Sequence, residues 1–152
     1  MDMQELLDRE AIRALMAQYN ISGDRGRLDR LAATFADDGV IEFGGERTQG
    51  PAAIAARLGT PGGGKNPALS LVRHNLTTSE VTIDGDTAEG RTYFFVCTNS
   101  GPDHQGVYVD RLKRTPEGWR FAHREVRIDW QAETTLFQPL NVRGRAPAPA
   151  KS

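Results

Sequence analysis

Apolar residues recur at helical spacing in the first part of the chain and gather into long runs in the second half. One face of a helix predicted over residues 5–19 carries apolar side chains at i, i+3, i+4 and i+7, namely Ile12, Leu15, Met16 and Tyr19. Ser22-Gly23 is expected to end this helix. A shorter apolar stripe predicts a second helix, which residues 36–39 should stop, with one face formed by Leu28, Leu31 and Phe35.

A short strand and a third helix are expected next, over residues 40–43 and 51–58. This helix opens at Pro51, because proline suits the first helical position, where its missing N–H costs nothing. Gly59 should close it. Residues 60–67 are rich in glycine and proline and are expected to form a loop.

The remainder of the chain predicts four long β segments, over residues 71–83, 87–99, 105–115 and 119–130. Gly- and Pro-containing turns join them, among them a loop through Gly101-Pro102. Helices followed by an antiparallel meander indicate an α+β fold. Long twisted strands curl, and a curled sheet closed by helices encloses a pocket. We expect one domain over residues 1–140 and a disordered tail over 141–152, where no apolar pattern continues.

The composition excludes several classes of partner. The chain has 152 residues, a net charge of −1 and scattered charges, which argues against a nucleic-acid or membrane surface as partner. No apolar run approaches the roughly 20 residues of a membrane span, and the charged beginning is unlike a signal peptide. Cys97 is the one cysteine, so no internal disulfide can form and a reducing, cytoplasmic location is expected.

The sequence carries neither a metal-binding nor a phosphate-binding motif. Its three histidines lack ligand spacing, and the glycine-rich residues 62–65 lack the Lys-Ser/Thr ending of a phosphate loop. We therefore expect no metal and no cofactor. His104, within Pro-Asp-His-Gln-Gly, is expected at a solvated turn. His123 is expected to be structural, on the strand face opposite Arg124, which it shares with Trp119 and Phe121.

Six short stretches, in this order, resemble a SnoaL-like member of the NTF2-like superfamily: residues 12–19, 31–38, 48–51, 73–74, 83–88 and 118–124. They span nearly the whole chain except the tail. The resemblance implies a cone, in which N-terminal helices close a curved antiparallel sheet around a pocket. It implies a small apolar molecule, cyclic or aromatic, as the ligand.

Within that superfamily the chain is similar to scytalone dehydratase, bile-acid dehydratase and hexachlorocyclohexane dehydrochlorinase. The resemblance implies a cofactor-independent lyase with four catalytic residues. Asp24 orients the ring of His74, His74 is the base, and Tyr19 and Arg124 position or polarise the substrate. The second histidine of scytalone dehydratase has its nearest counterpart in Thr98 or its neighbour Cys97. Phe43 stands where ketosteroid isomerase carries its basic carboxylate, which argues against an isomerase of that design.

Elimination needs these residue types. A neutral imidazole can take a proton near neutral pH, and a carboxylate on its far nitrogen fixes the tautomer and stabilises the imidazolium. Taken singly, Asp24 fits a turn and His74 a half-buried structural histidine, so only their joint placement favours catalysis. Tyr19 lies on the apolar helical stripe and fits the core. Arg124 either lines a pocket or pairs with an acid.

The expected pocket has Phe43, Phe94 and Thr98 as candidate substrate-binding residues. Both faces of the strand around Phe94 are apolar, so a partner subunit is expected to cover the outer one, in a homodimer or homotrimer. The alternatives are a polyketide cyclase, an isomerase, an epoxide hydrolase or a non-catalytic ligand-binding module. An epoxide hydrolase needs a further carboxylate beside Arg124, for which Asp110 and Asp129 are candidates. A binding module predicts that Asp24 and His74 lie apart or are solvated, each satisfied by other partners.

Overall fold

The computed structural model describes residues 1–59 and 66–143, and these confirm the expected α+β class. The elements follow the order α1 (Met3–Asp24), α2 (Leu28–Ala32), β1 (Phe35–Phe43), β2 (Glu46–Gln49), α3 (Pro51–Gly59), β3 (Val72–Asp84), β4 (Thr87–Thr98), β5 (Gly101–Thr115) and β6 (Gly118–Gln131). The strands form one sheet in the order β2-β1-β6-β5-β4-β3. Neighbours are antiparallel except β1 and β6, which are parallel.

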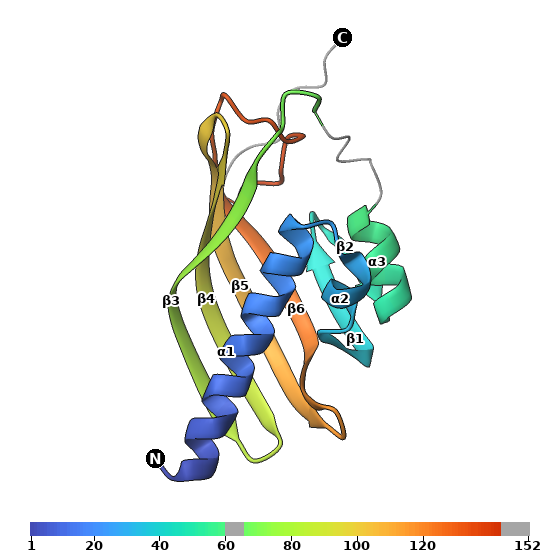
Figure 1. Cartoon of the computed structure of the whole chain (residues 1–152), viewed down its shortest axis with the longest axis vertical. Helices are drawn as coiled ribbons and strands as arrows, with labels where there is room; N and C mark the ends of the chain where they lie inside the picture. Colours follow the sequence, from blue (N-terminus) through green and yellow to red (C-terminus); the bar gives the residue numbers. More distant parts are fainter. Residues whose placement is uncertain (60–65, 144–152) are drawn as a thin grey trace.

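The curved sheet carries its helices on one face (Figure 1). Helix α1 lies across the strands, and α2 and α3 lie beside β1 and β2. The core forms between the helices and this inner face of the sheet, where Ile12 is 1% exposed and Phe121 is fully buried. Met16 approaches β4 closely, since its Cε lies 3.5 Å from where a Cβ on Gly90 would stand.

Helix α1 runs past the apolar stripe that ends at Tyr19, includes Ser22-Gly23, which was expected to end it, and ends at Asp24. The turn after it depends on Gly26, whose φ of +67° is a conformation that other residues rarely adopt. Arg27 N–H then donates to Ser22 O at 2.8 Å. This longer helix carries Asp24 to the start of β3.

The second predicted helix is shorter than expected, and the first strand begins earlier. Helix α2 ends at Ala32, and Phe35 is already the first residue of β1. The chain leaves the helix at Thr34, whose hydroxyl donates to Leu31 O at 2.6 Å and whose carbonyl accepts Phe121 N–H at 2.9 Å. A bulge at Gly39 follows, where a Cβ would lie 2.8 Å from Phe121 O.

The four long strands are confirmed, but the predicted loop through Gly101-Pro102 is wrong. Strand β5 begins at Gly101, where φ is +101°, so β4 and β5 are joined by a tight turn. Glycine turns also join β3 to β4 and β5 to β6. Because β5 starts early, His104 lies within a strand rather than in a loop.

The segment after β6 folds back on the sheet. The Gln131 side chain donates to Gln138 O at 3.0 Å and accepts Leu140 N–H at 2.9 Å. Val142 then forms a β-bridge with Ile128. Most of the expected tail, residues 144–152, and most of the expected loop, residues 60–65, lie outside the described residues. No helix in the described part of the chain is long and apolar enough to cross a membrane.

Candidate functional site

The end of α1 meets the start of β3 through two hydrogen bonds between Asp24 and His74. The ring Nδ1 lies 2.5 Å from Asp24 Oδ1, and His74 N–H donates to Asp24 Oδ2 at 2.9 Å. A carboxylate accepts only, so Nδ1 carries a proton, and in the neutral form of the ring Nε2 presents its lone pair. The His74 side chain keeps 25% of its surface exposed and that of Asp24 keeps 8%. The carboxylate therefore fixes an imidazole that a ligand can reach.

A second aspartate–histidine pair, which the sequence did not predict, lies on β5. The expectation of a solvated turn at His104 is wrong, since His104 is 6% exposed and Asp103 is 2% exposed. His104 Nδ1 lies 2.7 Å from Asp103 Oδ1. That carboxylate also accepts the Thr135 hydroxyl at 2.8 Å and Leu136 N–H at 2.9 Å. The adjacent Asp-His in the sequence was the signal that could have indicated this pair.

The imidazole rings of His74 and His104 lie next to each other on the inner face of the sheet. Their ring centroids lie 6.3 Å apart in an edge-on arrangement of 81°. Phe94, an expected lining residue, lies 6.3 Å from the His74 ring and 6.4 Å from the His104 ring. Phe137, from the segment after β6, contacts His104 edge-on at 5.1 Å. The aromatic rings thus flank both imidazoles.

Arg124 belongs to a different cluster and pairs with an acid. Its guanidinium donates to both Asp110 oxygens at 2.8 Å, and both side chains are fully buried. The rings of Tyr19, Tyr108 and Phe121 surround it at 4.0–4.3 Å. Burial by itself lowers the pKa of Arg124, but the Asp110 carboxylate outweighs it and the pKa rises. Arg124 therefore stays charged, and burial raises the pKa of Tyr19, which stays a neutral phenol.

Stacked rings separate this cluster from the imidazoles. Tyr19 contacts Tyr108 edge-on at 5.9 Å, and Tyr108 stacks on Phe94 at 4.3 Å. The Asn20 side chain donates to the Tyr108 hydroxyl at 3.0 Å. Two fully buried polar atoms lack a protein partner in the described residues, Asn20 Oδ1 and Arg124 Nη1. The structure thus brings Asp24, His74 and Phe94 together, and it places Tyr19 and Arg124 behind the stack.

Of the other two expected lining residues, Phe43 lies far from His74 across the sheet, whereas Thr98 pairs with Val72 of β3, two residues before His74. Phe43 ends β1, four strand spacings from β3, and lines a groove of about 650 Å³ with Arg57 and Leu140. Thr98 ends β4, where its hydroxyl accepts the N–H of Ser100 at 3.1 Å within the turn.

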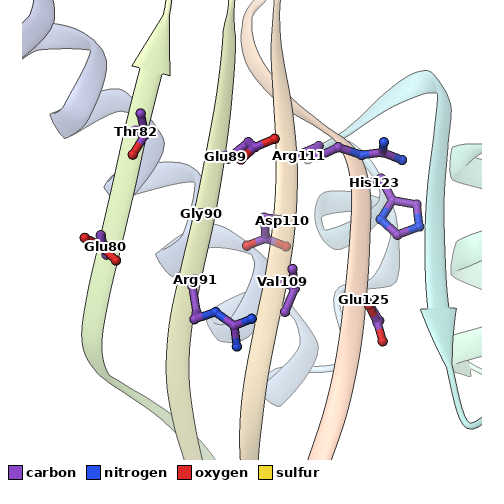
Figure 2. Close-up of a pocket in the computed structure, with 10 residues that line it drawn as sticks. All are labelled: Glu80, Thr82, Glu89, Gly90, Arg91, Val109, Asp110, Arg111, His123 and Glu125. Carbon is purple, nitrogen blue, oxygen red and sulfur yellow. The ribbon is translucent and has the colours of Figure 1, made fainter.

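The opposite face of the sheet carries a hollow of about 430 Å³ (Figure 2). Charged side chains such as Glu80, Arg91 and Glu125 line it, and α1 lies behind the strands. None of the four predicted catalytic residues lines this hollow. No group of three or more potential metal ligands forms among the described residues.

His123 also lines this hollow, which corrects its expected neighbours. Phe121 contacts Arg124 on the inner face, so it does not share a face with His123. A bulge between Arg111 and Leu112 shifts the register there. Side chains change faces at such a shift, because strand alternation has a period of two.

A family model described as SnoaL-like domain matches residues 4–125. An uncharacterized protein of Mycobacterium tuberculosis is 30% identical, over 92% of this chain and 93% of its own length. An NTF2-like protein with a cystatin-like fold from Novosphingobium aromaticivorans has a TM-score of 0.75 and 32% identity, over 83% of this chain and 84% of that one.

Two further solved structures share the fold over nearly the whole chain. A provisional scytalone dehydratase from Novosphingobium aromaticivorans has a TM-score of 0.76 and 22% identity, over 96% of this chain and 99% of that one. A hexachlorocyclohexane dehydrochlorinase from Novosphingobium barchaimii has a TM-score of 0.71 and 21% identity, over 98% and 99%. With the helices, the curved sheet and the family match in agreement, the chain belongs to the SnoaL-like family, whose fold is NTF2-like.

Proposed function

We propose that the protein is a cofactor-independent lyase, of dehydratase or dehydrohalogenase type, acting on a small apolar cyclic or aromatic molecule. The observation that carries this proposal is the Asp24–His74 pair, with its ring contact of 2.5 Å and its second, backbone hydrogen bond of 2.9 Å. Side-chain exposure of 25% leaves the His74 ring accessible to a ligand.

In the proposed reaction, His74 Nε2 takes a proton from a carbon of the substrate. The electron pair of that C–H bond forms the new double bond, and the neighbouring carbon loses its leaving group with the bonding electrons. The group departs as halide, or, where it is a hydroxyl, as water formed with the proton that His74 has taken up. Asp24 stabilises the imidazolium that forms and holds the ring in place.

The two enzymes named among the solved structures support this reaction class. One carries the name scytalone dehydratase and the other hexachlorocyclohexane dehydrochlorinase, so both names denote eliminations. We propose that Tyr19 and Arg124 act as positioning residues, because Tyr108 and Phe94 lie between them and His74. Thr98 stays a proposed substrate contact beside His74, and Phe43 stays a proposed contact although it lines the separate groove beside β1.

The test uses purified protein with scytalone, followed by absorbance, and with γ-hexachlorocyclohexane, followed by chloride release. Proton exchange of 2-tetralone in D2O, followed by NMR, tests the base without a leaving group. We expect Asp24→Asn and His74→Ala to lose whichever of these activities the protein shows, and His123→Ala to retain it. Full activity in both dyad variants, or no activity on any probe in the wild type, would contradict the proposal.

Epoxide hydrolysis is the second candidate, because a carboxylate does pair with Arg124. The partner is Asp110, on the neighbouring strand, with both hydrogen bonds at 2.8 Å. Both side chains are fully buried, so an epoxide would reach them only if the ring stack opened. Diol formation from styrene oxide, lost in Asp110→Asn and retained in His74→Ala, would favour this activity over elimination.

We also propose a cytoplasmic homo-oligomer, dimer or trimer, formed through the outer face of the sheet. Tyr93, Phe95 and Trp130 are 51%, 37% and 43% exposed there, which is unusual for large aromatic side chains. Light scattering after size exclusion measures the assembly. We expect Tyr93→Glu to reduce its mass, and a wild-type monomer would contradict the proposal.

A further inference from the structure

His104 and His74 come from different strands but point into the same space. Val96 of β4 is the register partner of both, so the three residues stand in one row across the inner face. The two ring centroids are 6.3 Å apart, and Phe94 contacts both rings. A ligand of aromatic size that touches His74 therefore lies beside His104.

Asp103 determines which nitrogen of His104 carries the proton. Its carboxylate accepts the Thr135 hydroxyl and Leu136 N–H, and it lies 2.7 Å from His104 Nδ1. Burial by itself raises the pKa of Asp103, but these hydrogen bonds outweigh it and the pKa is lowered. An ionised carboxylate accepts only, so the Nδ1 nitrogen of His104 is protonated.

His104 is a neutral ring with a lone pair on Nε2. Burial lowers its pKa and the facing His74 lowers it further, against the opposing effect of Asp103. No described residue donates to Nε2 of either imidazole, and neither nitrogen belongs to the fully buried unpaired atoms. Nε2 of the neutral His104 ring is thus a hydrogen-bond acceptor to which no described residue donates, and it is not among the fully buried unpaired atoms.

We propose that His104, held by Asp103, is a specificity-determining residue that accepts a hydrogen bond from a hydroxyl group of the ligand. The site then selects hydroxylated rings, with the aromatic faces of Phe94 and Phe137 beside the ring and His104 Nε2 at its O–H. This inference rests on the proposed function for its site. It deepens that function, because it favours hydroxylated substrates over halogenated ones that carry no donor.

The binding test compares 2-naphthol with 2-methoxynaphthalene, which has the same rings and no O–H. Fluorescence titration of the whole chain measures both dissociation constants. We expect the wild type to bind 2-naphthol up to about tenfold more tightly, as one hydrogen bond to a neutral acceptor allows. His104→Phe should bind both probes equally. The matched control His123→Phe, on the outer face, should keep the wild-type preference.

A second measurement does not depend on any variant folding. In ¹⁵N NMR of the wild type, His104 Nε2 should show the shift of an unprotonated nitrogen and should move with 2-naphthol but not with the ether. Equal wild-type affinities, a preference that persists in His104→Phe, or a protonated Nε2 would each overturn the inference. Loss of the preference in His104→Phe, with full turnover in Asp24→Asn and His74→Ala, would contradict the proposed function alone.

Discussion

Two aspartate–histidine pairs of the same composition lie within one inner surface, yet they differ in origin and in burial. Asp24 and His74 are 50 residues apart, whereas Asp103 and His104 are neighbours in one strand. The His74 side chain is 25% exposed, against 7% for His104. Under the proposed function, its exposure lets His74 exchange a proton with a ligand. Burial lowers the pKa of His104 and keeps that ring neutral. Environment, rather than residue type, separates the two roles.

The carboxylates differ as well. Asp24 accepts two donors from one residue, its partner His74. Asp103 also accepts from Thr135 and Leu136, and so fastens the segment after β6 to the sheet. The Asp24 carboxylate thus holds only its histidine, whereas the Asp103 carboxylate holds its histidine and the segment after β6. Variants of the two pairs should consequently separate activity from stability.

The largest expected effect is on turnover. Replacing His74 with Ala removes the proposed general base, which should lower kcat/KM by about 10²–10⁴-fold on an accepted substrate. Replacing His104 with Gln keeps a polar side chain and leaves the base intact, so turnover should fall far less. Steady-state kinetics measures both, with circular dichroism as the folding control. Equal losses in the two variants would remove the distinction between the pairs.

The next effect is on the free energy of unfolding, which should fall more in a variant of the Asp103–His104 pair than in a variant of the Asp24–His74 pair. Asp103→Ala leaves the buried Nδ1–H of His104 and the partly buried N–H of Leu136 without an acceptor, which should lower the free energy of unfolding by roughly 1–3 kcal/mol. Asp24→Ala should cost less, because water can reach its partner His74. Urea denaturation measures both, with the exposed Asp38→Ala as control. A larger loss in the Asp24 variant would contradict the comparison.

The pH dependence of stability should reveal His104. Its folded pKa lies below the unfolded value of 6.5, so the unfolded chain binds the proton first as the pH falls. Stability is therefore full above 6.5 and declines below it, by at most about 1.4 kcal/mol per pH unit. Asp103 has a lowered pKa, so its contribution holds above 3.8 and is lost only at lower pH. Urea denaturation between pH 8 and 5 should show a smaller decline in His104→Gln than in the wild type.

The smallest expected effect is the loss of the hydrogen bond from the Thr135 hydroxyl to Asp103. Thr135→Val keeps the side-chain volume and removes the hydroxyl that donates to Asp103, which should cost about 1 kcal/mol of unfolding free energy. The His74 pair should not respond, so kcat/KM should stay at the wild-type value. A loss of turnover without a loss of stability would show that the two pairs are coupled.

Much of the fold followed from local patterns. The helical stripe ending in Tyr19 and the Pro51 helix start are features of consecutive residues, and both are confirmed. The exceptions occur where the chain leaves a regular element. Phe35 fits the apolar stripe of a helix but begins a strand, because Thr34 bonds to Phe121 far along the chain. Spacing alone cannot indicate a partner of that kind.

The candidate site divides in the same way. Asp24 and His74 were selected from the sequence by their joint placement, and the structure brings them into contact. The sequence left two alternatives for Arg124, lining a pocket or pairing with an acid. Its partner Asp110 is identified only by the pairing of β5 with β6. The prediction of a solvated turn at His104 was wrong. Its burial follows from the tight turn at Gly101, whereas Gly101-Pro102 had predicted a longer loop.

The sequence by itself determined the order of the helices and strands except for β2, together with the family resemblance and the choice of Asp24 and His74 as a candidate pair. These features depend on neighbouring residues or on the order of motifs. Only the tertiary structure decided which side chains share a face. At each bulge the strand alternation shifts by one, as at Gly106, where a Cβ would clash with the carbonyl oxygen of Arg127. Such shifts are set by the neighbouring strand, so the second pair appeared only when the sheet was assembled.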